Sequence, residues 1–463
     1  MSLPMHTLLS PRDIVRAGMC IGCGSCVAQA DAPDTHMQFD AYGHLKPHGP
    51  PAWLRRRSER FTHTCPFSPA ARNEDQLAAE LFPTAAQRDA SLGRFHTAYV
   101  GYVAEEDFRR QGSSGGMVSW VATELLRKGF IDGVAHVVAT EDPHNAGRFF
   151  RYRISRTEEA IRAGAKSRYY PSDLAEMLTM IRAVPGRYAV VGIPCLIKAV
   201  QLLRREDPVL RARIRFTLGL FCGHMKSARF IESFAWQMQV PLRDIVRVEF
   251  RYKAPERPAN WYNARLTLRD GRIVQKDWWH LADGDWGAGF FMNAACNVCD
   301  DVVAETADIA FGDAWVEPYA SDGRGTNVVV VRSLAIANLV VSAIHEDRLQ
   351  LDVVDSAFVE QTQAAGFRQR REGLAYRLSW GRRGVQPRKR VVPDAHTPTP
   401  RRKLLYRLRY GISTWSHRVF WCARLMQKPH FYLRWARMAA AVYQGLAYHR
   451  GKVGNIIKRF GLQ

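Results

Sequence analysis

The chain has 463 residues, of which 47% are apolar, enough for a substantial core and two or three domains. No stretch approaches the roughly 18 apolar residues of a membrane-spanning helix, and the segment from Met1 to Arg16 lacks the apolar region of a signal peptide. We therefore expect a reducing cytoplasm, where grouped cysteines indicate metal or redox chemistry rather than disulfides. The net charge is +22, but nineteen Lys and Arg against one acid follow residue 381, so the basicity belongs to the C-terminal tail.

The N-terminal region carries a C-x-x-C-x-x-C pattern formed by Cys20, Cys23 and Cys26. Gly22 and Gly24 permit the positive φ angles of a tight loop that presents three thiolates on one side. This spacing is typical of a [4Fe–4S] cluster, and Cys65, which precedes a proline, is the candidate fourth ligand. The alternatives are a zinc site with four cysteine ligands, which usually consists of two C-x-x-C pairs, and cysteines grouped by chance. We expect a cluster module over residues 1–70 and a helical connector over 71–96.

A strand, a loop and a helix follow. Residues 98–103 are predicted to form a strand, residues 118–126 have the apolar spacing of a helix, and residues 131–140 read as a second strand. We interpret these elements as a βαβ unit. The Gly/Ser-rich loop Gln111–Gly116 precedes the helix, where backbone N–H groups and the helix dipole favour a phosphate. A plain flexible connection is the alternative, because the loop matches no standard nucleotide-binding pattern.

A second βαβ unit places two cysteines just after strands. The apolar strand 187–193 runs into Pro194-Cys195, a helix covers 197–204, and the strand 214–221 ends in Cys222. If these parallel strands are neighbours about 5 Å apart, both thiols reach one crevice. Open α/β sheets bind their ligands at that edge.

The alternating residues 245–280, with a hairpin turn at Asp270-Gly271, predict an antiparallel excursion from the sheet. A C-x-x-C pair then precedes further strands over 307–311 and 327–331. Together with the two strand-end cysteines, this pair forms a second predicted cluster set: Cys195, Cys222, Cys296 and Cys299. The alternative, a buried small apolar side chain, fits Cys195 or Cys222 individually but fits poorly for the C-x-x-C pair beside them. Cys422, in the tail, is left over.

Several of these blocks, in this order, resemble the coenzyme F420 hydrogenase/dehydrogenase beta-subunit family, which includes 7-hydroxymethyl chlorophyll a reductase. They are the two cysteine sets, the Gln111–Gly116 loop, Ile131–Val134, Lys166-Ser167-Arg168-Tyr169 and Gly312-Asp313, within residues 20 to about 355. The resemblance implies two 4Fe-4S clusters and an FAD, with Lys166 as the candidate catalytic residue and a flavin contact. The flavin contacts that it implies are Ser113, Ser114, Gly115, Gly116, Lys166, Ser167, Gly312 and Asp313. A solvated lysine is the alternative for Lys166, Ser114 stands where we expect a glycine, and no residue pattern identifies an F420 pocket.

The predicted fold class is therefore α/β, with a ferredoxin-like iron–sulfur module over residues 1–70. A mostly parallel α/β flavin domain with an antiparallel excursion follows over 97–375, then a Pro/Arg-rich linker over 376–402 and a basic amphipathic helical tail over 403–463. In the tail, aromatic and aliphatic residues recur between positive charges. This pattern suits an anionic membrane surface. Packing on the body or on a partner protein is the alternative, and the near-neutral body argues against nucleic acid.

The predicted function is an FAD-dependent iron–sulfur oxidoreductase. It would take electrons from a ferredoxin-like donor or partner redox subunit and transfer a hydride to an organic acceptor or coenzyme F420. One alternative is an electron-transfer subunit without its own substrate. Another is a redox enzyme that acts on surface-polysaccharide or lipid-linked intermediates, and a third is a zinc-stabilised nucleic-acid binder. We expect a cytoplasmic protein with peripheral contact to the inner face of the membrane.

Overall fold

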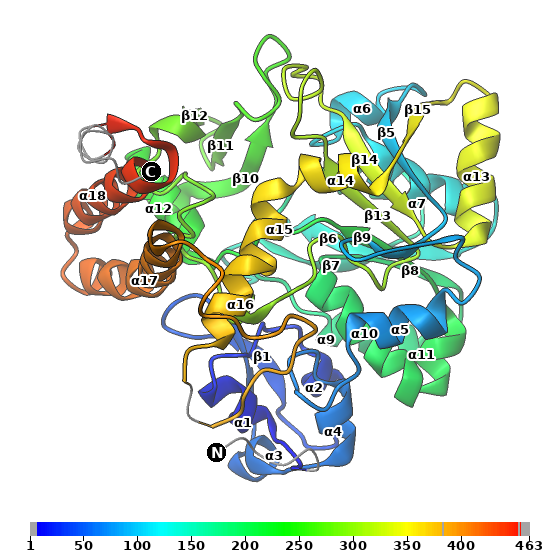
Figure 1. The fold of residues 1–463 in the computed structure, drawn as a ribbon, viewed down its shortest axis with the longest axis horizontal. Helices are drawn as coiled ribbons and strands as arrows, with labels where there is room; N and C mark the ends of the chain where they lie inside the picture. The colour runs from blue at the N-terminus through cyan, green and yellow to red at the C-terminus, as the bar shows by residue number, and fades with distance from the viewer. Residues whose placement is uncertain (1–6, 382–383, 452–453, 455–463) are drawn as a thin grey trace.

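A mixed eight-stranded sheet forms the centre of the molecule (Figure 1). The computed structural model describes residues 7–381, 384–451 and 454. The sheet order is β15-β5-β14-β13-β9-β8-β6-β7. In chain order these strands are β5 (Thr97–Val103), β6 (Gly133–Ala139), β7 (Phe150–Ser155), β8 (Tyr188–Gly192), β9 (Ile214–Leu220), β13 (Ile309–Asp313), β14 (Asn327–Val331) and β15 (Leu349–Val354).

Helices cover both faces of this sheet because its central strands are apolar on both sides. In β8, Ala189 and Val191 pack with α7 (Met117–Arg127) and α13 (Leu334–His345). The alternate residues Tyr188 and Val190 pack on the opposite face with α9 (Ala175–Ala183) and α10 (Pro194–Glu206). This two-sided burial is expected for strands inside an α/β sheet. Four further helices belong to this domain: α6 (Phe108–Gln111), α8 (Glu158–Ala163), α11 (Pro208–Arg213) and α12 (Arg229–Gln237).

The first predicted βαβ unit needs correction. The strand β5, the helix α7 and the strand β6 are present, but β5 pairs only with β14 and β15, antiparallel to both. Four strands of the sheet separate β5 from β6. The sheet is parallel only through β13, β9, β8 and β6, although β5 also points in that direction. Local periodicity predicts each strand but cannot reveal its partner, because pairing is decided by segments far away in the chain.

The second predicted βαβ unit is confirmed, because β8 and β9 are parallel neighbours. The helix after β8 begins at Pro194, three residues earlier than expected, so Cys195 lies in its first turn. Proline suits this position because it has no N–H to donate and its φ is already helical.

The N-terminal residues form a small module below the sheet (Figure 1). It contains α1 (Pro11–Arg16), α2 (Ser25–Ala28), the antiparallel pair β1 (His36–Phe39) and β2 (Leu45–His48), α3 (Pro51–Arg55) and α4 (Glu59–Thr64). Its apolar residues share one core with α9 and α10. The predicted connector contains α5 (Glu74–Leu81), the strand β3 (Gln87–Asp89) and the strand β4 (Gly93–Phe95). The start of the chain, residues 1–6, lies outside the described residues.

The antiparallel excursion is confirmed as a separate three-stranded sheet of β10 (Ile245–Tyr252), β11 (Asn263–Leu268) and β12 (Ile273–Asp277). The short helices η1 (Leu242–Asp244), η2 (Trp278–His280) and η3 (Ala294–Val298) flank it in the chain. After the main sheet come α14 (Ser356–Thr362), α15 (Ala364–Arg370) and α16 (Glu372–Leu378).

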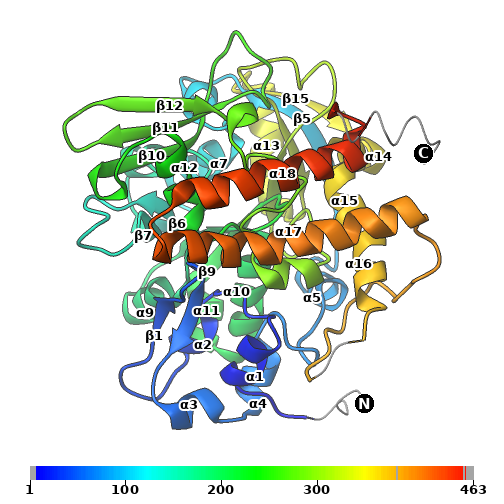
Figure 2. The ribbon, with the colours of Figure 1, turned by 90° about the vertical axis from the view of Figure 1, so that its left-hand side faces the viewer.

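The basic tail forms a helical hairpin of α17 (Pro400–Leu425) and α18 (Pro429–Tyr448), which lies against one side of the molecule (Figure 2). Its apolar face shares a core with the body, and Trp236 of α12 stacks on Phe420 at 4.2 Å between ring centroids. Packing on the body therefore occupies one face of the hairpin. In the described residues no helix is long and apolar enough to cross a membrane. The end of the predicted tail, residues 455–463, lies outside that part of the chain.

Candidate functional site

The first cysteine set converges at the junction of the N-terminal module and the body. Gly22 and Gly24 have φ of +82° and +79°, as the tight loop requires, and Gly24 precedes α2, which carries Cys26. Cys65 ends α4, where its N–H donates to the carbonyl of Phe61. Cys20, Cys23 and Cys65 belong to one cluster of packed side chains, and α2, which carries Cys26, contacts α4, which ends at Cys65. Burial raises the pKa of the Cys26 thiol.

The second cysteine set converges at the carboxyl ends of β8 and β9. Cys195 and Cys222 come from these neighbouring strands, and Cys296 and Cys299 come from the loop of η3. The N–H of Met225 donates to the Cys296 sulfur at 3.3 Å. Burial raises the pKa of the Cys195 thiol. Cysteines of both sets pack in one buried cluster of side chains, and α2, which carries Cys26, contacts α10, which carries Cys195. The two sets are therefore neighbours.

Both sets have the donor chemistry of an iron–sulfur cluster. Among the described residues, no group of three or more His, Cys, Asp or Glu has the spacing to hold a single metal ion. Four thiolates on one zinc would lie about 3.8 Å apart, given Zn–S bonds of about 2.3 Å in a tetrahedron. A cubane spreads its ligands over four separate irons, and thiolate is the ligand that it takes. Two groups of four neighbouring thiols, each fully or partly buried, fit such clusters.

A cavity of about 1040 Å³ opens beside the second set, at the carboxyl ends of β8, β9 and β13. Seven of the eight residues implied as flavin contacts line it: Ser113, Ser114, Gly116, Lys166, Ser167, Gly312 and Asp313. Gly115 is not part of the lining. A Cβ at Gly115 would lie 2.8 Å from the carbonyl oxygen of Gly101 and from Oδ1 of Asn327, so this glycine serves close packing. The flavin roles of all eight stay predictions.

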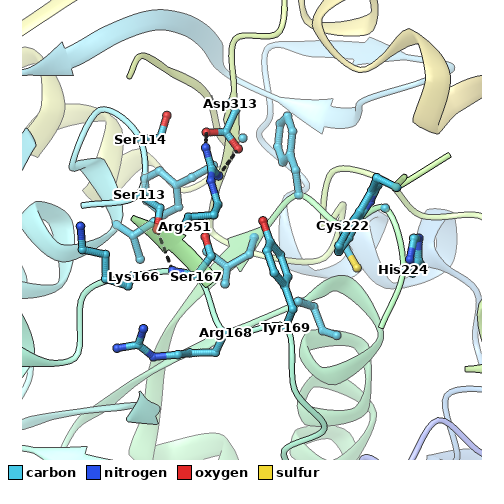
Figure 3. A pocket seen from close by; sticks show the side chains of 18 of the residues that line it. Ser113, Ser114, Lys166, Ser167, Arg168, Tyr169, Cys222, His224, Arg251 and Asp313 are labelled. Carbon is cyan, nitrogen blue, oxygen red and sulfur yellow. Dashed lines mark hydrogen bonds and ion pairs between the residues drawn. The ribbon is translucent and has the colours of Figure 1, made fainter. Parts of the chain in front are cut away.

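The Gly/Ser loop is held in place by its own hydroxyls. Ser113 Oγ accepts a hydrogen bond from the N–H of Ser167 at 2.7 Å (Figure 3). Ser114 Oγ donates to the carbonyl of Thr326 at 2.8 Å. The serine that stands in place of the expected glycine thus fastens the loop to the residue that precedes β14. The ammonium of Lys253 also donates to the carbonyl of Ser114 at 2.7 Å. These hydrogen bonds fix the loop in the wall of the cavity.

Lys166 lies in the cavity wall with an unusual backbone. Its φ is +111°, a region that residues with a side chain rarely adopt and that costs about 1–3 kcal/mol. Burial lowers the pKa of its ammonium, while Glu249 acts in the opposite direction. Strain of this kind is often found at ligand sites, which makes Lys166 a candidate ligand contact.

The strongest polar pair in the cavity joins Arg251 to Asp313, and the sequence did not predict its arginine. The guanidinium donates two hydrogen bonds to the carboxylate, at 2.9 and 3.0 Å (Figure 3). Alternation along β10 would place Arg251 on the same solvent side as Arg247 and Glu249. A register shift between Glu249 and Tyr252 turns Arg251 inward, where it is 4% exposed. A bulge of this kind has no reliable signal in a single sequence.

His224 was also missed, although its position after β9 at the sheet edge could have indicated it. Its ring stacks on Trp286 at 4.3 Å between centroids and is 3% exposed. Neither ring nitrogen has a hydrogen-bond partner among the described residues. Burial holds the pKa of His224 well below its usual range. Both His224 and Cys222 line the cavity, so the cavity borders the second cysteine set (Figure 3).

These features define a class of protein: an α/β chain with a large cavity at the carboxyl ends of its parallel strands and two neighbouring sets of four cysteines beside it. Comparison with known families gives the particular family. The model "Coenzyme F420 hydrogenase/dehydrogenase, beta subunit N-term" matches residues 98–179, and the model for the C terminus of the same beta subunit matches residues 186–357. The chain belongs to this family, which supports an oxidoreductase role with electron transfer.

Three curated relatives are distant. An uncharacterized protein of Methanocaldococcus jannaschii is 23% identical over 339 residues, which cover 68% of this chain and 83% of the relative. The coenzyme F420 hydrogenase subunit beta of Methanococcus voltae is 21% identical over 249 residues, 50% of this chain and 80% of the relative. The coenzyme F420-dependent sulfite reductase of M. jannaschii is 24% identical over 319 residues, 65% of this chain but only 43% of the relative.

The fold also occurs in a solved structure. A chain of the F420-reducing [NiFe] hydrogenase complex of Methanosarcina barkeri superposes with a TM-score of 0.50 at 17% identity, over 65% of this chain and 99% of that one. At this identity the similarity concerns the fold alone.

Proposed function

We propose that this chain is an iron–sulfur flavoprotein oxidoreductase. It takes electrons from a ferredoxin-like donor or a partner redox subunit and reduces an organic acceptor or coenzyme F420. When bound, two [4Fe–4S] clusters and FAD would supply the one-electron transfer and the hydride chemistry. Cys20, Cys23, Cys26 and Cys65 would hold one cluster, and Cys195, Cys222, Cys296 and Cys299 the other.

One observation carries the proposal: the first cysteine set, the second set and the cavity are consecutive neighbours. Cysteines of both sets pack in one buried cluster of side chains, and Cys222 of the second set lines the cavity. Electron transfer requires cofactors that are close together in a series. An arrangement of two neighbouring thiol sets, fully or partly buried, that ends at a ligand-sized cavity supports such a series.

The cavity residues have separate tasks in this proposal. Lys166 and the fixed wall of Ser113, Ser114, Gly116 and Ser167 bind and orient the flavin. Arg251 and Asp313 hold each other in place, and their opposite charges leave this part of the wall neutral overall. His224, with two unpartnered ring nitrogens among the described residues, is available to hydrogen-bond a polar group of the flavin or of the acceptor.

The test is the iron, acid-labile sulfide and flavin content of the anaerobically purified full chain, together with its visible spectrum. About eight irons and one FAD per chain are expected. Four irons with FAD would limit the proposal to one cluster. Zinc without flavin would overturn it.

A second candidate, an electron-transfer subunit without its own substrate, is favoured by one relative, the beta subunit of coenzyme F420 hydrogenase. The same preparation distinguishes between the two candidate functions. An enzyme with its own acceptor reduces it when supplied with reduced ferredoxin, whereas a pure electron-transfer subunit is inactive until its catalytic partner is added. Cytoplasmic location and contact with the inner face of the membrane stay predictions.

A further inference from the structure

The residues that follow the part of the chain matched by the family models contact the loop that carries Cys296 and Cys299. The family models end at residue 357. After that point, Arg377 donates to the carbonyl of Asn297 at 2.8 Å and Arg371 donates to the carbonyl of Asp300 at 2.7 Å. Lys389, in the expected linker, pairs with the Asp300 carboxylate at 3.1 Å. This segment therefore packs on the cysteine loop and supplies buried positive charge to it.

One of these cations reaches the cysteine set itself. Arg370, the last residue of α15, is 4% exposed, and its Nη2 donates to the carbonyls of Cys222 and Gly223 at 2.8 and 2.9 Å. Its Nε and Nη1 have no hydrogen-bond partner among the described residues. A guanidinium stays charged, and a buried N–H without an acceptor costs about 1–3 kcal/mol. These two nitrogens therefore indicate an acceptor that belongs to a bound group.

The position of Arg370 identifies that group. Its Nη2 is bound to the backbone of Cys222, a member of the second set, so its two unpartnered nitrogens lie beside that set. The sulfur atoms of a cluster held by these cysteines accept hydrogen bonds. Arg409 is a second buried cation, 7% exposed, on α17, which contacts the helix η3 that carries Cys296.

We propose that Arg370 sets the reduction potential of the cluster held by Cys195, Cys222, Cys296 and Cys299, by donating N–H groups to its sulfur atoms and by offsetting its negative charge. This inference rests on the proposed function. Cluster potentials depend on net charge, on hydrogen bonds to sulfur and on solvent exposure. Reduction adds one electron from an external reductant and moves no proton on Arg370, so a fixed cation stabilises the reduced cluster and raises the potential.

The test is a redox titration of the full chain, followed by electron paramagnetic resonance. Signals are assigned to the two clusters with Cys23→Ser and Cys299→Ser. In Arg370→Gln the ratio of reduced to oxidised second cluster at a fixed potential should fall at least tenfold, a shift of about 59 mV for one electron. In Arg370→Lys, which keeps the charge but not the planar donor fork, the same ratio should fall at least threefold. The midpoint potential of the first cluster should stay unchanged and serves as an internal reference.

Arg437→Gln is the matched control, because it removes the same charge from an exposed position on α18 in the tail. Unchanged midpoints of the second cluster in both Arg370 variants, with about eight irons retained, overturn the inference and leave the proposed function standing. If Arg370→Gln does not retain the second cluster, the test rests on Arg370→Lys. A second-cluster midpoint potential in Arg370→Lys equal to that of the wild type then overturns the inference. A wild-type chain with FAD and the first cluster but no second cluster overturns the inference and limits the proposed function to one cluster.

Discussion

His44 of the N-terminal module and His417 of α17 meet through their Nε2 atoms, which lie 3.3 Å apart. The two residues are 373 positions apart in the chain, and both rings are buried. His417 Nε2 is also 3.2 Å from the carbonyl oxygen of Met292. This contact joins the module of the first cysteine set to the C-terminal hairpin that covers the second, so the two ends of the chain are held together beside the site.

The histidine pair predicts a loss of stability in mild acid. Burial lowers the pKa of His417 to about 4 and holds the pKa of His44 well below its usual range. The positive charge of Lys46 lowers both pKa values further, and that of Lys226 lowers the pKa of His417. An unfolded histidine titrates near 6.5, so between pH 6.5 and 4 the unfolded chain binds protons that the folded chain does not. Stability is therefore complete above pH 6.5 and falls as the pH falls toward 4.

For His417 alone the expected loss between pH 7.5 and 5.5 is about 1 kcal/mol. His417→Gln should reduce this pH dependence, measured as the free energy of urea unfolding at both pH values. His430→Gln, in an exposed position of α18, is the control. An unchanged pH dependence in His417→Gln would contradict the prediction.

Asp313→Asn should destabilise the chain by about 2 kcal/mol, because it leaves Arg251 buried without its carboxylate. Measurement of the free energy of unfolding checks this value. The same variant should retain less flavin after gel filtration, since Arg251 and Asp313 lie in the cavity wall. Asp270→Asn breaks a solvent-exposed pair with Arg272 and should leave stability and flavin content unchanged. Equal effects of the two variants would argue against a special role for the buried pair.

Lys166→Gly separates strain from ligand binding. Glycine adopts a φ of +111° without strain, so the variant should be as stable as the wild type or slightly more stable. The loss of the ammonium should weaken FAD binding by tenfold or more, as a charge-assisted hydrogen bond contributes about 1.5–3 kcal/mol. Flavin fluorescence titration of the FAD-depleted chain measures this change. Lys166→Gln should weaken binding similarly while it keeps the strained backbone; unchanged affinity in both variants would exclude Lys166 as a flavin contact.

Single cysteine variants should divide the iron between the two sets. Cys23→Ser and Cys299→Ser are each expected to lose about four of eight irons, with loss of half the visible absorbance. Cys422→Ser, on α17, should keep all of the iron and serves as the matched control. Loss of all iron in either single variant would mean that the two sets do not form independent sites.

The outer face of the hairpin predicts binding to anionic vesicles. Trp415, Leu425, Phe431 and Met438 are exposed there, among the basic residues of the same helices. The full chain should sediment with phosphatidylglycerol vesicles at low salt, be released at high salt and stay in solution with phosphatidylcholine vesicles. The absence of sedimentation at low salt would contradict the membrane prediction and favour a protein partner for this face.

Some features follow from local patterns and could therefore be predicted. The spacing around Cys23, with Gly22 and Gly24, requires a tight loop whatever the rest of the chain does, because positive φ is a property of the backbone. Apolar runs predict β8 and β9, and two cysteines directly after such strands lie at one sheet edge once the strands are parallel neighbours. The antiparallel excursion is local as well, since each of its strands pairs with the next strand in the chain.

By itself the sequence determined the two cysteine sets, the strand–helix order and the concentration of positive charge in the tail, because each depends on short-range spacing or composition. Only the tertiary structure decided that β5 lies far from β6, that a bulge turns Arg251 inward, and that Arg370 reaches the second cysteine set. Long-range packing selects among pairings that are equally compatible with local periodicity. The tail shows this most clearly: its charge is evident in the composition, but part of that charge is buried against the cysteine loop, where the surrounding carboxylates and thiols stabilise it.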